Sequence, residues 1–268
     1  MSYLGPSAIG GPVVQADPAH VAPRSMGTAK RVLITQSNYI PWKGYFDNLA
    51  RCDVFVVYDD MQYTRRDWRN RNQVKTKDGL KWLTVPVAVK GKYDQAINQT
   101  RIDGQAWRRN HLETLHHAYA KAPHFKVVHD WLTEVYMEMD FDLLTDLNVH
   151  LLRKIGLRLG INTEFRDSRE FRLEGDRTER LVNICKALGA DEYLTGPAAK
   201  TYMEEGKFND AGVRVTYSNY KGYPEYPQQF PPFIHSVSIL DVLYNCGGNA
   251  RNMIHVPGSS DGTGERHS

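Results

Sequence analysis

Residues 32–72 read VLITQSNYIPWKGYFDNLARCDVFVVYDDMQYTRRDWRNRN, and this stretch decides the fold class. The apolar runs Val32–Ile34 and Val54–Val57 have the length of buried strands, and Tyr45–Arg51 between them has the length of a short helix. Strand, loop, helix and strand in this order predict half of a Rossmann-like α/β sheet. Ligands of such sheets bind beyond the carboxyl ends of the strands, where both polar loops of this stretch would lie.

The remaining sequence continues the alternation of strands and helices. A hairpin is expected around the turn Lys77-Asp78-Gly79, with its second strand over Leu80–Val89. Helices are predicted at 106–120, 125–137, 141–159, 198–205, 236–246 and from a cap at Asp176 or Thr178 to Leu188, and strands at 162–166, 192–194 and 213–217. We therefore predict an α/β fold with a Rossmann-like, mostly parallel sheet and a helical insertion at about residues 105–160.

Composition limits the class of protein. A single domain over residues 30–255 is expected, with a disordered leader at 1–29 and a disordered tail at 256–268, because both ends are rich in glycine, proline and polar residues and lack the apolar density to fold. The net charge of +3 argues against bulk nucleic-acid binding. Three isolated cysteines and no long apolar run predict a reduced, soluble, cytoplasmic protein without a disulfide framework or membrane span. The oligomeric state is left open.

Several short motifs occur in the order found in a known family. They are Gln36-x-x-Tyr39-x-Pro41-Trp42-x-Gly44-Tyr45-Phe46-Asp47, Asp59-Asp60-x-Gln62-Tyr63, Trp68-x-Asn70-Arg71-Asn72, Trp82-Leu83-Thr84-Val85-Pro86-Val87, Tyr193-Leu194-Thr195-Gly196-Pro197 and Ser238-Ile239-Leu240-Asp241-Val242-Leu243-Tyr244-Asn245. Over residues 31–247 the chain resembles WbqC-like proteins. The resemblance implies a component of bacterial surface-polysaccharide (lipopolysaccharide, O-antigen) or sugar-modification pathways and leaves the reaction open.

The tetrapeptide Trp42-Lys43-Gly44-Tyr45 follows a strand and begins a helix. Its position is similar to that of the HIGH signature of nucleotidyltransferases, in which glycine and a helix N-terminus approach a phosphate. Lys43 can supply charge, but the histidines of that signature are missing. We expect these four residues to contact substrate.

The two carboxylates at the end of the second strand, Asp59 and Asp60, are the first catalytic candidates. One of them is expected to act as a base, to orient a sugar hydroxyl or to hold Mg²⁺, or else both pair with nearby arginines. Asp60 is the preferred base and Asp59 its support, since alternation turns them to opposite faces. His235, just before the last helix, is the third catalytic candidate. No metal-ligand spacing of His or Cys is present in the sequence.

Further residues are expected to bind substrate because they combine planar rings, forked donors and amides. In the arginine-rich segment they are Arg66, Trp68, Arg69, Asn70, Arg71 and Asn72; elsewhere they are Gln36, Asn38, Tyr39, Gln62, Thr195 and Gly196. Arginines would hold phosphate, and Trp42 or Trp68 would stack on a ring. Thr195-Gly196 is read equally well as a plain helix cap. The tyrosine- and proline-rich segment 217–232 is either a lid or a cover for the core.

The function favoured is a transferase acting on a nucleotide-linked sugar, with an amino sugar expected, in surface-polysaccharide or glycoconjugate synthesis. Acyl or aminoacyl transfer to the sugar amine is the reaction we expect. The alternatives are an ATP-dependent nucleotidyl-transfer or adenylate-forming enzyme and a non-catalytic module that binds nucleotide sugars. The cofactor is not identified by the sequence, with Mg²⁺ as one candidate.

Overall fold

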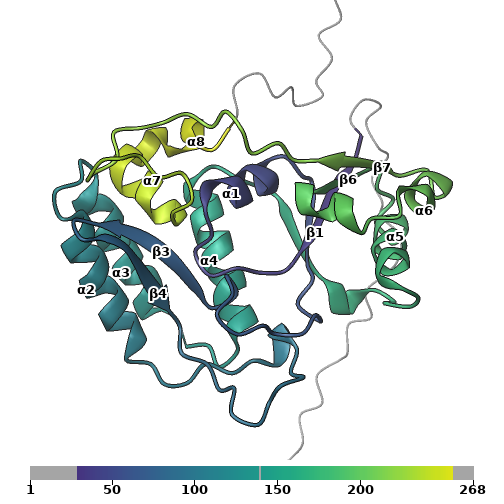
Figure 1. The fold of residues 1–268 in the computed structure, drawn as a ribbon, viewed down its shortest axis with the longest axis horizontal. Helices are drawn as coiled ribbons and strands as arrows, with labels where there is room; N and C mark the ends of the chain where they lie inside the picture. The colour runs from purple at the N-terminus through teal and green to yellow at the C-terminus, as the bar shows by residue number, and fades with distance from the viewer. Residues whose placement is uncertain (1–28, 139, 256–268) are drawn as a thin grey trace, which may run out of the picture.

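The computed structural model describes residues 29–138 and 140–255, and a five-stranded sheet lies on one side of the molecule (Figure 1). Its strands, in spatial order, are β5 (Glu164–Asp167), β2 (Val54–Val57), β1 (Arg31–Thr35), β6 (Glu192–Thr195) and β7 (Arg214–Tyr217). Every neighbouring pair is parallel. The predicted Rossmann-like α/β fold is therefore confirmed. The predicted leader and tail fall outside the described residues, apart from Ala29.

Helices cover both faces of this sheet. Leu33, Phe55 and Val57 point toward α1 (Lys43–Ala50) and α4 (Leu144–Arg158), and all of them belong to one apolar cluster. The alternate strand residues Val32, Ile34, Val54 and Val56 pack toward α5 (Arg177–Ala187) and α6 (Glu205–Asp210). Burial on both faces explains why these strands are continuous apolar runs in the sequence.

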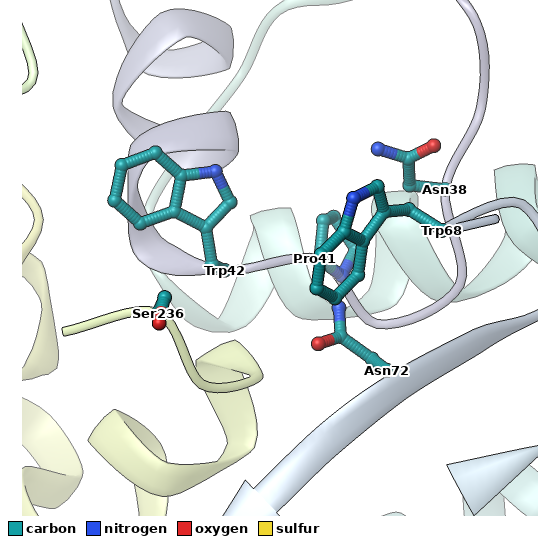
Figure 2. A pocket seen from close by; sticks show the side chains of 6 residues that line it. All are labelled: Asn38, Pro41, Trp42, Trp68, Asn72 and Ser236. Carbon is teal, nitrogen blue, oxygen red and sulfur yellow. The ribbon is translucent and has the colours of Figure 1, made fainter. Parts of the chain in front are cut away.

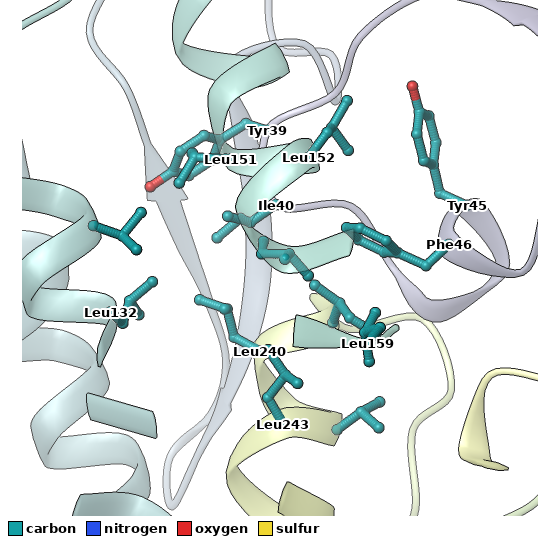
Figure 3. Packing of buried hydrophobic residues seen from close by; sticks show 14 of the residues in the cluster. Tyr39, Ile40, Tyr45, Phe46, Leu132, Leu151, Leu152, Leu159, Leu240 and Leu243 are labelled. Atoms are coloured by element: carbon teal, nitrogen blue, oxygen red, sulfur yellow. The ribbon is translucent and has the colours of Figure 1, made fainter. Parts of the chain in front are cut away.

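A second layer lies beside the sheet and contains the hairpin β3 (Arg71–Thr76) and β4 (Gly79–Thr84) (Figure 1). The helices α2 (Trp107–Tyr119), α3 (Phe125–Met137), α7 (Ile239–Cys246) and α8 (Ala250–Met253) complete it. Figure 3 shows side chains of α4 packed between α1, α3 and α7. The predicted helical insertion is thus present as α2, α3 and α4, and α4 connects it to the sheet.

Two predicted elements differ from the structure. The second hairpin strand ends at Thr84 instead of Val89: Val85 N donates to Asn70 O as the last bond of the ladder, and the next residue, Pro86, has no N–H to continue it. The predicted helix 198–205 is a short 3-10 helix, Pro197–Thr201, followed by α6. The aromatic anchor of this region is Phe208, which stacks on Tyr193 at 5.1 Å.

The strand order places a topological switch point between β1 and β6. The chain leaves β1 through α1 toward β2, and it leaves β6 through α6 on the other face toward β7. Ligand crevices of open α/β sheets form where neighbouring strands diverge in this way. The loop 36–42 after β1 begins at this edge of the sheet.

Among the described residues, no helix is long and apolar enough to cross a bilayer.

Candidate functional site

A pocket of about 250 Å³ lies beside the loop after β1 (Figure 2). It is lined by Asn38, Pro41, Trp42, Trp68, Asn72 and Ser236. Figure 2 shows the indoles of Trp42 and Trp68 on opposite sides, with Pro41 behind the Trp68 ring in this view. Tyr39 N donates to Trp68 O at 3.1 Å and joins the loop to the arginine-rich segment. We call this site the Trp42–Trp68 pocket.

Two asparagines in the pocket have orientations fixed by the protein. The Arg69 guanidinium donates to Asn38 Oδ1 and to Gln36 Oε1, and a guanidinium can only donate. The oxygen of Asn38 therefore faces Arg69, and its nitrogen faces the Trp42 side of the pocket (Figure 2). Asn72 Nδ2 donates to Ile40 O at 3.0 Å, and Asn72 Oδ1 accepts from Gln73 N at 2.8 Å, which leaves one lone pair of this oxygen for the pocket. The pocket thus presents one fixed donor and one fixed acceptor.

The backbone under the pocket is strained. Ile40 has φ of +36° although it is β-branched and precedes Pro41, two features that disfavour this conformation. Its carbonyl accepts hydrogen bonds from Asn72 Nδ2 and from Ser238 Oγ at 2.8 Å. These two side chains come from distant segments and hold the strained turn in place. Strained backbone that is held in place by several surrounding contacts is common at binding sites.

Asp59 lies in a closed network, away from the pocket. It is buried and accepts from Ser37 N at 2.8 Å, Ser37 Oγ at 2.6 Å and Thr145 Oγ1 at 2.8 Å. Burial raises the pKa of Asp59, and the hydrogen bonds from Ser37 and Thr145 act in the opposite direction. Asn148 donates to Ser37 Oγ and to Arg69 O and extends this Asp59 network to the arginine-rich segment.

Asp60 points in another direction. Its oxygens accept from Asn98 Nδ2 at 3.0 Å and from Ser168 Oγ, just beyond the end of β5. It is half-buried and does not line the Trp42–Trp68 pocket. The structure therefore separates both aspartates from that pocket, and the catalytic role of Asp60 stays a prediction.

Lys43 and Gly44 are not arranged for phosphate. Lys43 is 1% exposed, donates to Pro224 O at 2.9 Å and lies 5.3–5.4 Å from the ring centres of Tyr223, Tyr226 and Phe233. Burial lowers the pKa of Lys43 to about 8. A Cβ atom at Gly44 would lie 2.4 Å from Trp42 Cζ2, so the glycine makes room for the indole.

The other predicted binding residues divide into buried and exposed groups. Tyr39, Tyr45 and Asn70 are buried, and their side chains bond to His111, to the Gln36 carbonyl and to the Val85 carbonyl. Thr195 is buried, and Gly196 lies beside Tyr220, which packs on Trp42 at 5.1 Å. Gln62 and Arg66 are exposed, and Gln62 donates to Tyr93 O, whereas Arg71 is half-buried.

Ser236 is a lining residue that the sequence did not reveal. The segment 218–238 has no regular structure and is fixed by Tyr223 donating to Asp47 at 2.7 Å and Tyr226 donating to Asp241 at 2.6 Å. Tyr223 and Asp47 are more than 170 residues apart in the sequence, and no local sequence pattern predicts a contact between them. The tyrosine-rich segment therefore covers the core and carries Ser236 to the pocket.

His235 is the catalytic candidate nearest to the pocket, because it precedes the lining residue Ser236. Its ring packs edge-on against Phe233 at 4.7 Å. Reduced solvation and the charge of Lys43 lower the pKa of His235. No three His, Cys, Asp or Glu side chains group as metal ligands within the described residues. Mg²⁺ held by one carboxylate and a substrate phosphate needs no such group and stays a prediction.

Comparison with known proteins identifies the family. The profile of the WbqC-like protein family matches residues 36–253. The chain belongs to the WbqC-like family. An uncharacterized protein of Mycobacterium tuberculosis, Rv1507c, is 48% identical over 221 residues, which are 82% of this chain and 96% of that protein. No solved structure shows a significant match. The resemblance inferred from the sequence motifs is therefore confirmed.

Proposed function

We propose that this WbqC-like protein is a transferase that binds a nucleotide-linked amino sugar and acts in surface-polysaccharide or glycoconjugate synthesis. The observation that carries the proposal is the Trp42–Trp68 pocket, a small space lined by two tryptophans and by neutral polar groups. Indole faces suit the apolar C–H faces of a sugar ring, and amides and hydroxyls suit its substituents. The pocket volume of about 250 Å³ suits a single ring better than a whole nucleotide sugar, since sites for drug-sized ligands span about 300–1,000 Å³.

The fixed amides support an N-acylated or amino sugar. Asn38 offers its nitrogen as a donor and Asn72 offers its oxygen as an acceptor. A sugar amine or hydroxyl donates to the Asn72 oxygen, and a neighbouring hydroxyl or amide carbonyl accepts from Asn38. Because Arg69 and the Ile40 carbonyl set these orientations before binding, little side-chain entropy is lost when a ligand binds.

Acyl or aminoacyl transfer to the sugar amine is the proposed reaction. In that step the amine nitrogen attacks the carbonyl carbon of an activated acyl donor, the amine loses a proton, and the bond to the donor's leaving group breaks. His235 is the proposed base that accepts the proton, because it precedes the lining residue Ser236 and its lowered pKa favours the neutral imidazole. Asp60 is the alternative base.

A ligand screen by thermal unfolding tests the proposal. ATP, acyl-coenzyme A and sugars linked to UDP or dTDP are compared, and a ligand at a hundred times its Kd stabilises the fold by about 2.7 kcal/mol. We expect stabilisation by a nucleotide sugar that is lost in Trp42→Ala. It should persist in Trp131→Ala, whose indole packs on Arg158 of α4, away from the pocket residues.

The alternatives give different results in the same screen. Stabilisation by ATP together with pyrophosphate release would support the adenylate-forming enzyme. Nucleotide-sugar binding without turnover under any acyl donor would support the non-catalytic module. No response of the wild type to any nucleotide sugar would refute the proposal.

A further inference from the structure

An exposed aromatic surface adjoins the Trp42–Trp68 pocket on the hairpin β3–β4. Trp68 and Trp82 are 43% and 38% exposed, which is unusual for tryptophan in a folded protein. Their ring centres are 5.4 Å apart. Trp68 also lines the pocket, so the pocket and this surface share one indole. We call Trp68, Arg71 and Trp82 the Trp82 surface.

Arg71 is stacked on Trp82. Its guanidinium carbon lies 3.9 Å from the centre of the Trp82 ring, and Arg71 Nη2 donates to Arg66 O at 2.7 Å. The antiparallel register pairs Arg71 with Thr84 and Gln73 with Trp82, so these side chains share the outer face of the hairpin. The stack is therefore held by the strand register and by a backbone carbonyl, and its shape exists before a ligand binds.

The charge of this surface differs from that of the pocket. Residues 64–72 contain four arginines and a single aspartate, Asp67. Asp67 accepts from Thr64 Oγ1 at 2.6 Å and Trp68 N at 2.7 Å and lies 3.8 Å from Arg69 Nη2, so in the described part of the chain Arg65, Arg66 and Arg71 have no carboxylate partner. All six residues that line the pocket are uncharged. An uncharged pocket, suited to a neutral sugar, and an arginine-rich surface, suited to an anion, thus meet at Trp68.

We infer that the Trp82 surface binds the nucleoside diphosphate part of the ligand whose sugar occupies the Trp42–Trp68 pocket. This inference rests on the proposed function. The base stacks on the Trp82–Arg71 pair, since every base has a flat face and aromatic stacking tolerates any base. The diphosphate lies near Arg66 and Arg71, whose forked donors match phosphate oxygens. A neutral oligosaccharide would provide no anionic partner for the guanidinium groups of Arg66 and Arg71.

Calorimetry on the full-length chain tests the inference with UDP, dTDP and GDP, with the corresponding N-acetylglucosamine or glucose conjugates, and with N-acetylchitotriose as a neutral probe. Trp82→Ala should weaken binding of the preferred nucleoside diphosphate and of its sugar conjugate by about tenfold or more, as expected for one lost base–aromatic stack. Trp42→Ala should weaken the conjugate alone. Arg71→Gln should weaken binding of the nucleoside diphosphate more than binding of the corresponding nucleoside, which is measured in the same way.

Tyr202→Ala is the matched control, because Tyr202 is 41% exposed and carries Arg177 at 3.5 Å in a comparable stack away from the pocket. It should bind every probe as the wild type does. Trp82 is exposed, so an unchanged melting temperature verifies that the variant folds.

The outcomes separate the two proposals. Conjugate binding that weakens in Trp42→Ala and not in Trp82→Ala overturns this inference and leaves the proposed function standing. Loss of N-acetylchitotriose binding in Trp82→Ala, without an effect on diphosphates, assigns the surface to a glycan and also overturns it. Failure of the wild type to bind any diphosphate or conjugate overturns both.

Discussion

The Asp59 network and the Trp42–Trp68 pocket both include residues of the two loops that follow β1 and β2, but their polar groups are used differently. Asp59 directs both carboxylate oxygens at donors from Ser37 and Thr145, and all three residues are buried. In the pocket, Asn38 Oδ1 accepts a hydrogen bond from Arg69, and Asn38 Nδ2 has no hydrogen-bond partner within residues 29–138 and 140–255. The closed network stabilises the loops, and the half-used amide is available to a ligand.

The comparison shows that chemical type alone does not locate a site. Paired carboxylates at a strand end are reactive groups in sequence terms, yet Asp59 has all the partners of a structural residue. Lys43 belongs to the same closed class, since its ammonium is enclosed by three aromatic rings and the Pro224 carbonyl. Partner geometry separates the two classes, and variants can test this separation.

The largest expected effect is that of Asp59→Ala. Removing the carboxylate leaves three buried donors from Ser37 and Thr145 unpaired, which should lower the free energy of unfolding by about 3 kcal/mol. Asp60→Ala, at a half-buried side chain with two partners, should cost about 1 kcal/mol. Urea unfolding measures both. Equal losses in the two variants would remove the distinction between a closed and an open carboxylate.

The next effect concerns Lys43 and pH. Folded Lys43 has a pKa lowered to about 8 by burial, with Asp241 and Glu225 acting in the opposite direction, whereas an unfolded lysine titrates at about 10.4. Between these values the unfolded chain binds more protons than the folded one at this position. Stability contributed by Lys43 should therefore rise as pH increases from about 8 toward 10.4.

Lys43→Met lacks this titration and provides the comparison. Unfolding is measured in urea at pH 7 and pH 9.5 for both proteins. The wild type should gain stability relative to Lys43→Met at the higher pH. A difference between the two proteins that is the same at both values would show that Lys43 is solvated.

The smallest effect on stability is expected for Gly44→Ala. The new methyl group would meet the Trp42 ring at 2.4 Å, so the indole must move, and the ring is the mobile end of a side chain. Alanine favours the helix and offsets part of the cost, so stability should change by less than about 1 kcal/mol. Trp fluorescence and nucleotide-sugar affinity should change clearly.

Gly206→Ala is the control for this substitution, because nothing lies within 4 Å of a Cβ atom at Gly206 in α6. It should leave fluorescence and affinity unchanged. Unaltered affinity in Gly44→Ala would mean that the Trp42 position does not matter for binding.

The sequence predicted elements that local patterns determine. The apolar runs of β1 and β2 lie where they were expected, and of the two predicted cap positions, Asp176 and Thr178, the cap is Asp176, which accepts from Thr178 N and Glu179 N. Trp68, Trp42, Asn38 and Asn72 were named as binding residues and do line one pocket.

Other features depend on contacts between distant segments and could not be read locally. Burial of Lys43 requires Tyr223, Tyr226 and Phe233, about 180 residues further along the chain. Ser236 reaches the pocket only because segment 218–238 is fixed to α1 and α7. The sequence provided only weak evidence that Trp82 is exposed: it follows Lys81 in a predicted hairpin, a position compatible with the outer face.

The central claim is that the sugar of a nucleotide-linked sugar lies between Trp42 and Trp68. A crystal structure of the protein with the nucleotide sugar that gives the largest thermal stabilisation tests it most directly. The account predicts the sugar ring in the Trp42–Trp68 pocket, within hydrogen-bond distance of Asn38 Nδ2 and Asn72 Oδ1. A ligand bound instead at the hollow beside β5, which Phe141, His150 and Arg166 line, would contradict it.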